Sequence, residues 1–140
     1  MRILGLDVGE RRIGLAISDP NGQVAVPLKT LHRTDKVDAI PTIAALVIEE
    51  AVEGIVVGLP LRMDGSSGTQ AEIVREFVEG LLASVKVPVT LWDERLSTVQ
   101  AEQLLRGRPG SRKDKPEQDA LAAAIILQGY LDSRQGRRAV

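Results

Sequence analysis

The stretch that decides the fold runs from residue 3 to residue 19 and reads Ile3-Leu4-Gly5-Leu6-Asp7-Val8-Gly9-Glu10-Arg11-Arg12-Ile13-Gly14-Leu15-Ala16-Ile17-Ser18-Asp19. Two apolar runs, 3–9 and 13–19, are separated by three polar residues, a spacing typical of a β-hairpin. The next residues, 20–22, carry a Pro-Asn-Gly turn signal. Residues 24–31 then predict a third strand, which Pro27 weakens. We expect these three strands to form an antiparallel meander.

Beyond this meander, helical and strand patterns alternate. Apolar residues recur at three and four positions in 40–48 and 71–82, which predicts two amphipathic helices. Residues 54–58 and 87–92 read as strands, the first of them apolar throughout as in a buried parallel sheet. Residues 97–105 and 117–131 predict two more helices. This order is that of an α/β protein and matches the ribonuclease H-like fold: a mixed five-stranded sheet, antiparallel in its first three strands and extended by two parallel strands, flanked by helices.

Length and composition favour one folded domain. The chain has 140 residues, 44% of them apolar, which suffices for a sizeable core. We expect a single domain over residues 1–133 and a basic, flexible tail over 134–140. A charge interrupts the N-terminal apolar run at Asp7, which argues against a signal peptide, and no run approaches the ~20 residues that span a bilayer. We therefore expect a cytoplasmic protein with no membrane partner.

The net charge of -1 hides an asymmetry along the chain. Residues 1–105 carry a net charge of -5 and residues 106–140 a net charge of +4. The basic excess lies in the tail and in a Gly/Pro-bearing stretch that contains Arg106, Arg108, Arg112, Lys113 and Lys115. Such a stretch is either solvated loop or a contact for nucleic-acid phosphates, and composition leaves both open.

The scarce residue types narrow the chemistry. The chain has no cysteine, one histidine (His32) and three aromatic residues. These counts exclude thiolate zinc sites, multi-histidine metal sites and an aromatic base-stacking platform. Catalysis would have to rest on carboxylates, hydroxyls, lysines, arginines or backbone groups.

Asp7 is the first candidate, because a charge inside an apolar strand is costly unless it is paired or bound to metal. Glycines at 5 and 9 would let a ligand or another backbone approach closely. Two superfamilies use a strand that ends in an aspartate and a glycine-containing hairpin. Ribonuclease H-like nucleases present the carboxylate to a metal ion in this way, and actin/sugar-kinase ATPases bind phosphate with the same turn. The alternative is an aspartate that caps a turn.

Two further carboxylates fall where they could meet Asp7. Asp93-Glu94-Arg95 follows the fifth predicted strand, and strand alternation places only one of its two acids on the side of Asp7. Asp119 lies near the start of the last helix, whose alanines would let it pack closely on the sheet. Each acid could instead stabilise a helix N-terminus. Together, Asp7, Glu94 and Asp119 favour Mg²⁺ or Mn²⁺, two ions of which could serve phosphodiester hydrolysis.

These motifs resemble the YqgF family of bacterial Holliday-junction-resolvase-like proteins, also described as pre-16S rRNA nucleases. The similarity runs nearly end to end through four motifs, at residues 5–16, 57–65, 93–98 and 115–131. It implies a ribonuclease H-like fold, metal-dependent phosphodiester cleavage and maturation of the 5′ end of the small-subunit ribosomal RNA. Structured RNA, including the pre-ribosome, or branched DNA would be the partner of a monomer or a homodimer.

Carried over by motif, the resemblance implies that Asp7, Glu94 and Asp119 are the metal ligands and catalytic residues. Candidate nucleic-acid contacts are Arg11, Arg12, Arg106, Arg108, Arg112, Lys113 and Lys115. Arg95 fits a phosphate contact or a salt bridge. Many ribonuclease H-like resolvases have a fourth acid one helical turn after the last, where this chain has Ala122. One of two metal sites should therefore be weak.

Three functions remain open at this stage. The first is a metal-dependent nuclease for pre-16S rRNA, with resolution of branched DNA as its alternative substrate. The second is a sugar-kinase-type ATPase, which 140 residues disfavour because that fold normally needs two such domains. The third is an RNA-binding assembly factor with weak or no catalysis, consistent with the missing fourth acid.

Overall fold

The computed structural model describes residues 1–34, 38–96 and 115–134. The elements, in chain order, are β1 (Ile3–Val8), β2 (Arg12–Ser18), β3 (Ala25–His32), α1 (Ile40–Glu49), β4 (Gly54–Leu59), α2 (Thr69–Leu82), β5 (Val89–Asp93), the 3₁₀ helix η1 (Glu94–Leu96) and α4 (Lys115–Arg134). The helix expected over 97–105 lies outside the described residues. No helix in the described part of the chain is both long and apolar enough to cross a membrane.

The five strands form one sheet in the order β3-β2-β1-β4-β5. β2 pairs antiparallel with both β1 and β3, whereas β4 pairs parallel with β1 and β5. The predicted mixed sheet is thus confirmed. Because β1, β4 and β5 are parallel, their carboxyl ends share one edge of the sheet, where α/β folds bind ligands.

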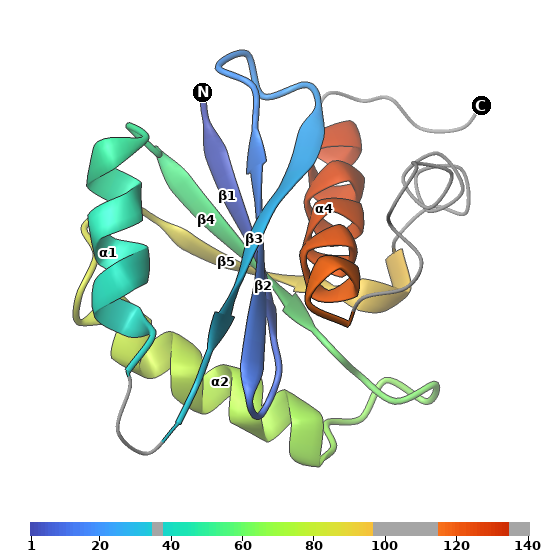
Figure 1. The fold of residues 1–140 in the computed structure, drawn as a ribbon. Helices are drawn as coiled ribbons and strands as arrows, with labels where there is room; N and C mark the ends of the chain where they lie inside the picture. The colour runs from blue at the N-terminus through green and yellow to red at the C-terminus, as the bar shows by residue number, and fades with distance from the viewer. Residues whose placement is uncertain (35–37, 97–114, 135–140) are drawn as a thin grey trace.

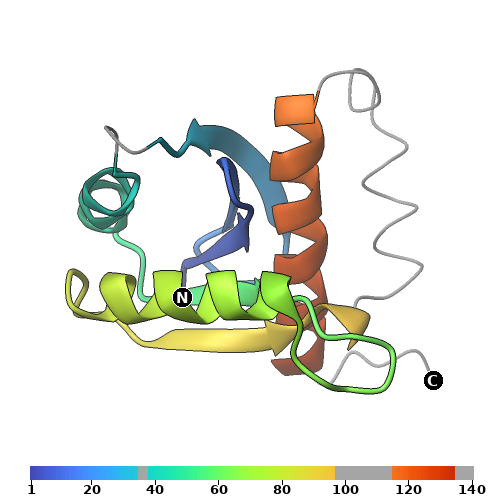
Figure 2. The same ribbon diagram turned by 90° about the horizontal axis from the view of Figure 1, so that it is seen from below.

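Strand alternation divides the core between the two faces of the sheet. Leu4, Leu6 and Val8 of β1 join the core beneath α1 and α2, whereas Ile3 joins the core beneath α4. Figures 1 and 2 show the sheet between α4 on one side and the pair α1 and α2 on the other. Asp7 follows the odd-numbered positions, so it faces α4.

Glycine on the sheet lets α4 pack unusually close. A Cβ added to Gly5 would lie 2.8 Å from the Cβ of Leu127, and one added to Gly14 would lie 1.9 Å from the backbone oxygen of Asp119. Only glycine leaves room for the helix backbone at residue 14. The close packing of α4 on the sheet therefore depends on glycines of the sheet as well as on the alanines of the helix, from which it was expected.

The helix ends differ from the sequence expectations. α2 begins at Thr69, two residues before its expected start, and its N-cap is Gly68, which offers no side-chain hydrogen bond. α4 begins at Lys115, so Asp119 lies in its second turn instead of its first. The same helix continues to Arg134, whose guanidinium lies 5.7 Å from the ring centroid of Tyr130. The helix thus runs one residue past the expected end of the domain at residue 133.

Candidate active site

Asp7 lies one residue before the end of β1, in a partly buried position on the α4 face. Its cross-strand partner is Gly14 of β2, the glycine that contacts the backbone of Asp119. Burial and the negative charge of Asp119 raise the pKa of Asp7 from 3.8 to about 6. Sheet register and helix packing together thus bring Asp7 and Asp119 into electrostatic contact.

Glu94 is the first residue of η1, directly after β5. It lies over Gly58 of β4, because a Cβ added to Gly58 would be 3.0 Å from both Cγ and Oε1 of Glu94. Burial, followed by the charges of Asp7 and Asp93, raises the pKa of Glu94 from 4.5 to about 7. Glycine on β4 therefore makes the space in which the glutamate approaches Asp7.

Asp93 takes a different role from its neighbour. The guanidinium of Arg95 lies against it, with Nη2 donating to Oδ2 at 2.7 Å and Nε to Oδ1 at 3.1 Å. These hydrogen bonds lower the pKa of Asp93. Arg95 also donates from Nη1 to the backbone oxygen of Met63 at 3.3 Å, which ties the β4–α2 loop to η1. Of the two readings open for Arg95, the structure shows the salt bridge.

Asp119 faces the same region from α4. Its side chain is 26% exposed, yet its Oδ2 atom is fully buried, and no donor in the described residues makes a hydrogen bond to it. Arg12 Nε lies 2.8 Å from that oxygen as an ion pair without hydrogen-bond alignment. A buried carboxylate oxygen that pairs with a cationic side chain and receives no aligned hydrogen bond suits a metal cation that takes the place of the arginine.

The three carboxylates form two electrostatic pairs that share Asp7, instead of a preassembled cage. No group of three or more Asp, Glu or His side chains within the described ranges is placed to hold a metal ion as it stands. The oxygen donors, the buried Asp119 oxygen without a hydrogen bond and the raised pKa values of Asp7 and Glu94 nevertheless fit a hard divalent cation. Bound positive charge would relieve the repulsion among these acids.

The arginines of the β1–β2 turn lie on opposite faces. Arg12 faces Asp119, whereas Arg11 is exposed and lines a cavity of about 520 Å³ with Glu10, Arg33 and Thr34. The four basic residues at 106, 108, 112 and 113 lie outside the described residues, as does the side chain of Lys115.

Arg33 is a residue that sequence reasoning missed. Its Nη1 donates to the backbone oxygen of Gly9 at 2.7 Å, and its backbone N–H donates to the oxygen of Arg11 at 2.7 Å. Its guanidinium also lies 5.0 Å from the ring centroid of Phe77. Arg33 thus anchors the turn that carries both arginines to α2. Its place two residues beyond the third predicted strand was the available signal.

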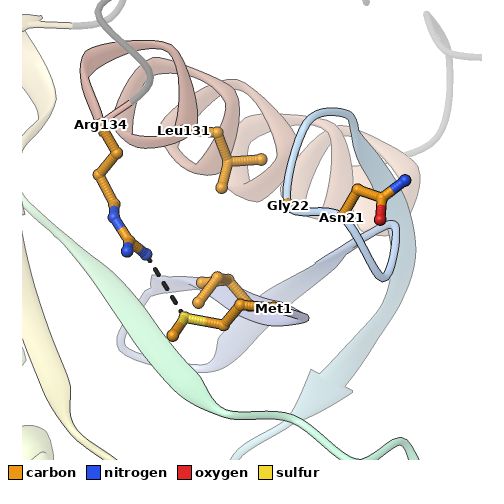
Figure 3. A pocket seen from close by; sticks show the side chains of 6 residues that line it. Met1, Asn21, Gly22, Leu131 and Arg134 are labelled. Atoms are coloured by element: carbon orange, nitrogen blue, oxygen red, sulfur yellow. Dashed lines mark hydrogen bonds between the residues drawn. The ribbon is translucent and has the colours of Figure 1, made fainter.

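A separate cavity of about 140 Å³ lies at the far end of α4, between Met1 and Arg134 (Figure 3). Ile3 and Leu131 line it together with the turn residues Asn21 and Gly22. None of these lining residues is acidic. Ile3 is the first residue of β1 and Asp7 is its last but one, so this cavity and the carboxylate site lie at opposite ends of the strand.

Solved structures define the class of fold. T. thermophilus RuvC in complex with a Holliday junction substrate aligns with a TM-score of 0.63 at 20% identity, over 97% of this chain and 96% of that one. The Fowlpox virus resolvase in complex with Holliday junction DNA aligns with a TM-score of 0.59 at 12% identity, over 96% and 99%. The chain therefore has the fold of the ribonuclease H-like resolvases.

Sequence comparison shows the family. The profile of the RuvX family, described as "Holliday junction resolvase", matches residues 1–133, and the chain belongs to this family of nucleases. A relative from Chloroflexus aggregans is 51% identical over 136 residues, covering 95% of this chain and 94% of its own. One from Caldanaerobacter subterraneus subsp. tengcongensis is 48% identical over 137 residues, covering 96% and 99%. Both carry the name "Putative pre-16S rRNA nuclease". The resemblance inferred from the motifs is thereby confirmed.

Proposed function

We propose that this protein is a divalent-cation-dependent endonuclease that hydrolyses phosphodiester bonds in structured RNA, at the 5′ end of pre-16S rRNA. The observation that carries the proposal is the position of Asp7, which interacts electrostatically with both Glu94 and Asp119 at the carboxyl ends of the parallel strands. Family membership and the names of the relatives support the reaction and the substrate.

Asp7, Glu94 and Asp119 would hold Mg²⁺ or Mn²⁺ and are the proposed catalytic residues. A divalent pair bound there supplies an activated water and stabilises the developing charge on phosphate oxygens. The fold holds these carboxylates close together in a partly buried place. Gly58 leaves the space for Glu94, and Gly14 leaves the space for the backbone of α4. Divalent binding requires ionised carboxylates, so it would release the fraction of protons that Asp7 and Glu94 still hold at a pH near their raised pKa values of about 6 and about 7.

The substrate backbone would contact Arg11 and Arg12 on the β1–β2 turn and the basic residues of 106–115. Arg12 lies beside Asp119, so a phosphate that it binds would also lie beside the carboxylates. Contacts of this kind hold the backbone without reading base sequence. A branched DNA substrate would meet the same residues, and the family description and the RuvC fold favour it as the second candidate.

A side-by-side cleavage assay tests the proposal. Wild-type protein, Asp7→Asn and Asp93→Asn would each be offered an RNA bearing the pre-16S 5′ extension and a four-way DNA junction, with Mg²⁺, with Mn²⁺ and with a chelator. We expect metal-dependent cleavage of the RNA by the wild type and a loss of at least about a thousandfold in Asp7→Asn, because a metal site supplies several kcal/mol. Asp93→Asn is the matched control, since Asp93 binds Arg95.

Each contrary result has its own meaning. Equal cleavage by wild type and Asp7→Asn would refute the site. Cleavage of the junction alone would replace the RNA substrate with branched DNA. Binding of both substrates without metal-dependent cleavage would identify a non-catalytic assembly factor.

A further inference from the structure

Arg12 and Asp119 form an ion pair at the edge of the acidic site. Arg12 Nε lies 2.8 Å from Oδ2 of Asp119, with the two side chains 33% and 26% exposed. Despite the short distance, the N–H is not aligned for a hydrogen bond, and Oδ2 receives none from the described residues. The arginine therefore neutralises the carboxylate without occupying its lone pairs as an aligned donor would.

We infer that Arg12 is a positioning residue that serves as the resident counter-ion of Asp119 in the metal-free protein, competes with the divalent cation for that carboxylate, and turns to a substrate phosphate when the cation binds. This inference rests on the proposed function, because it concerns the same acidic site. It assigns Arg12 two successive partners, a carboxylate and then a phosphate. Metal loading and substrate binding would thereby be coupled.

The backbone contacts show which partner would move. Gly14 lies against the backbone of Asp119, in a space too small even for a Cβ, so the backbone that carries the carboxylate is held against β2. The backbone oxygen of Arg12 accepts a hydrogen bond from the N–H of Gly9 at 2.8 Å, which fixes the turn. The long side chain of Arg12 is then the free element. It can leave Asp119 by rotation about its own bonds while both backbones stay where they are.

Charge and geometry give the direction of the exchange. A divalent cation carries twice the charge of a guanidinium and coordinates carboxylate oxygens directly, so it displaces Arg12 at sufficient concentration. The planar fork of arginine suits the two oxygens of a phosphate, whereas its contact with Asp119 is an ion pair through Nε without hydrogen-bond alignment. Arg12 gains better hydrogen bonds from a substrate phosphate than it gives up at Asp119.

The test measures cation binding without any nucleic acid. Mn²⁺ affinity would be determined by isothermal titration calorimetry for wild type, Arg12→Gln and Arg11→Gln. Arg11 is a matched control, because it is the neighbouring residue, carries the same charge and lies on the opposite face of the turn. We expect Arg12→Gln to bind Mn²⁺ about tenfold more tightly than wild type and Arg11→Gln to stay within about twofold. An Arg12→Gln affinity equal to or weaker than that of Arg11→Gln would overturn the inference.

A second measurement uses the wild-type protein, so it does not depend on the folding of a variant. The arginine Nε–H resonances would be followed by ¹H–¹⁵N NMR during titration with Mg²⁺. We expect the signal of Arg12 to shift as Mg²⁺ binds, and the signal of Arg2, which pairs with Glu50 at the other end of the sheet, to stay in place. Binding of Mg²⁺ with an unmoved Arg12 signal would overturn the inference and leave the proposed function intact. Absence of any Mg²⁺ binding would instead refute the proposed metal site.

Discussion

At the scale of single residues, the site combines carboxylates with opposite responses to their surroundings. Burial and like charge raise the pKa of Asp7, whereas hydrogen bonds from Arg95 lower the pKa of Asp93. Asp7 and Asp93 lie near the ends of β1 and β5, two parallel strands that β4 separates, yet Asp7 faces Asp119 of α4 whereas Asp93 faces Arg95. Environment, and not residue type, decides which aspartate is suited to a cation.

This contrast predicts the pH dependence of the stability of the metal-free protein. A carboxyl whose pKa is raised on folding contributes stability that is present below its unfolded pKa and lost as pH rises through its folded pKa, here about 6. We therefore expect Asp7→Asn to be more stable than wild type by roughly 1–3 kcal/mol near pH 8 and equal to it near pH 4. Urea denaturation in the presence of a chelator measures both values.

Asp93→Asn supplies the control of opposite sign. The pKa of Asp93 is lowered, so its contribution to stability is present near pH 8 and disappears in acid. This variant should be no more stable than wild type at the higher pH. If Asp7→Asn and Asp93→Asn gave the same pH profile, the assigned environment of Asp7 would be wrong.

At the scale of elements, the site depends on how closely α4 packs on the sheet. Asp119 reaches Asp7 because the helix backbone lies directly on Gly14, and Glu94 reaches the same place because Gly58 has no side chain. The helix and the strands are each recognisable from local periodicity. The separation of α4 from the sheet is set by Gly14, whose partner Asp119 lies about a hundred residues away in the chain.

The packing of α4 can be tested with a pair of glycine-to-alanine substitutions. In Gly14→Ala the new Cβ would lie 1.9 Å from the oxygen of Asp119, a backbone atom that cannot yield without moving the helix. We expect a loss of at least about 3 kcal/mol in the free energy of unfolding, because overpacking costs 1–3 kcal/mol and backbone clashes more. Equilibrium urea denaturation gives this value.

Gly80→Ala is the matched control within α2. There the new Cβ would approach only the Cδ1 atom of Ile40, at 2.9 Å, which is the far end of a flexible side chain. Alanine also favours the helix by about 1 kcal/mol over glycine. The variant should stay within about 1 kcal/mol of wild type. Equal losses in both variants would mean that α4 does not lie on Gly14 as described.

At the scale of the whole molecule, negative and positive charges are concentrated in different parts of the chain. The net charge of -1 is the sum of an acidic part, which supplies Asp7 and Glu94, and a basic part from residue 106 onward. A cation bound at the site would offset the acidic part locally. The basic part would then be left to attract a phosphate backbone.

The salt dependence of RNA binding tests this division. We expect Arg112→Gln/Lys113→Gln to bind the pre-16S fragment more weakly and to flatten the slope of log K against log salt by up to about 1.4 to 1.8, the share of two phosphate contacts. Arg2→Gln/Lys86→Gln removes equal charge at the other end of the sheet, before β1 and β5. Fluorescence anisotropy over a range of KCl gives the slopes, and equal slopes for the two double variants would make 106–115 solvated surface.

Much of the fold and part of the site could be predicted from the sequence. The strand pattern indicated a sheet of five strands, antiparallel in the first three and extended by two parallel strands, but not their order in the sheet. The alternation of Asp93 and Glu94 indicated that one acid only would face Asp7. Helix ends were harder to predict: α4 begins two residues before its expected start, and Gly68 caps α2 without a side chain. End positions depend on tertiary contacts that local patterns do not contain.

The sequence by itself determined the elements, the mixed sheet and the set of acids available for a metal site, because these follow from periodicity and from residue chemistry. Only the tertiary structure decided that Asp7 lies between Glu94 and Asp119, that Arg12 pairs with Asp119 and that Arg33 anchors the β1–β2 turn. These contacts join residues far apart in the chain. They depend on sheet register and on the close packing of α4, which no local pattern encodes.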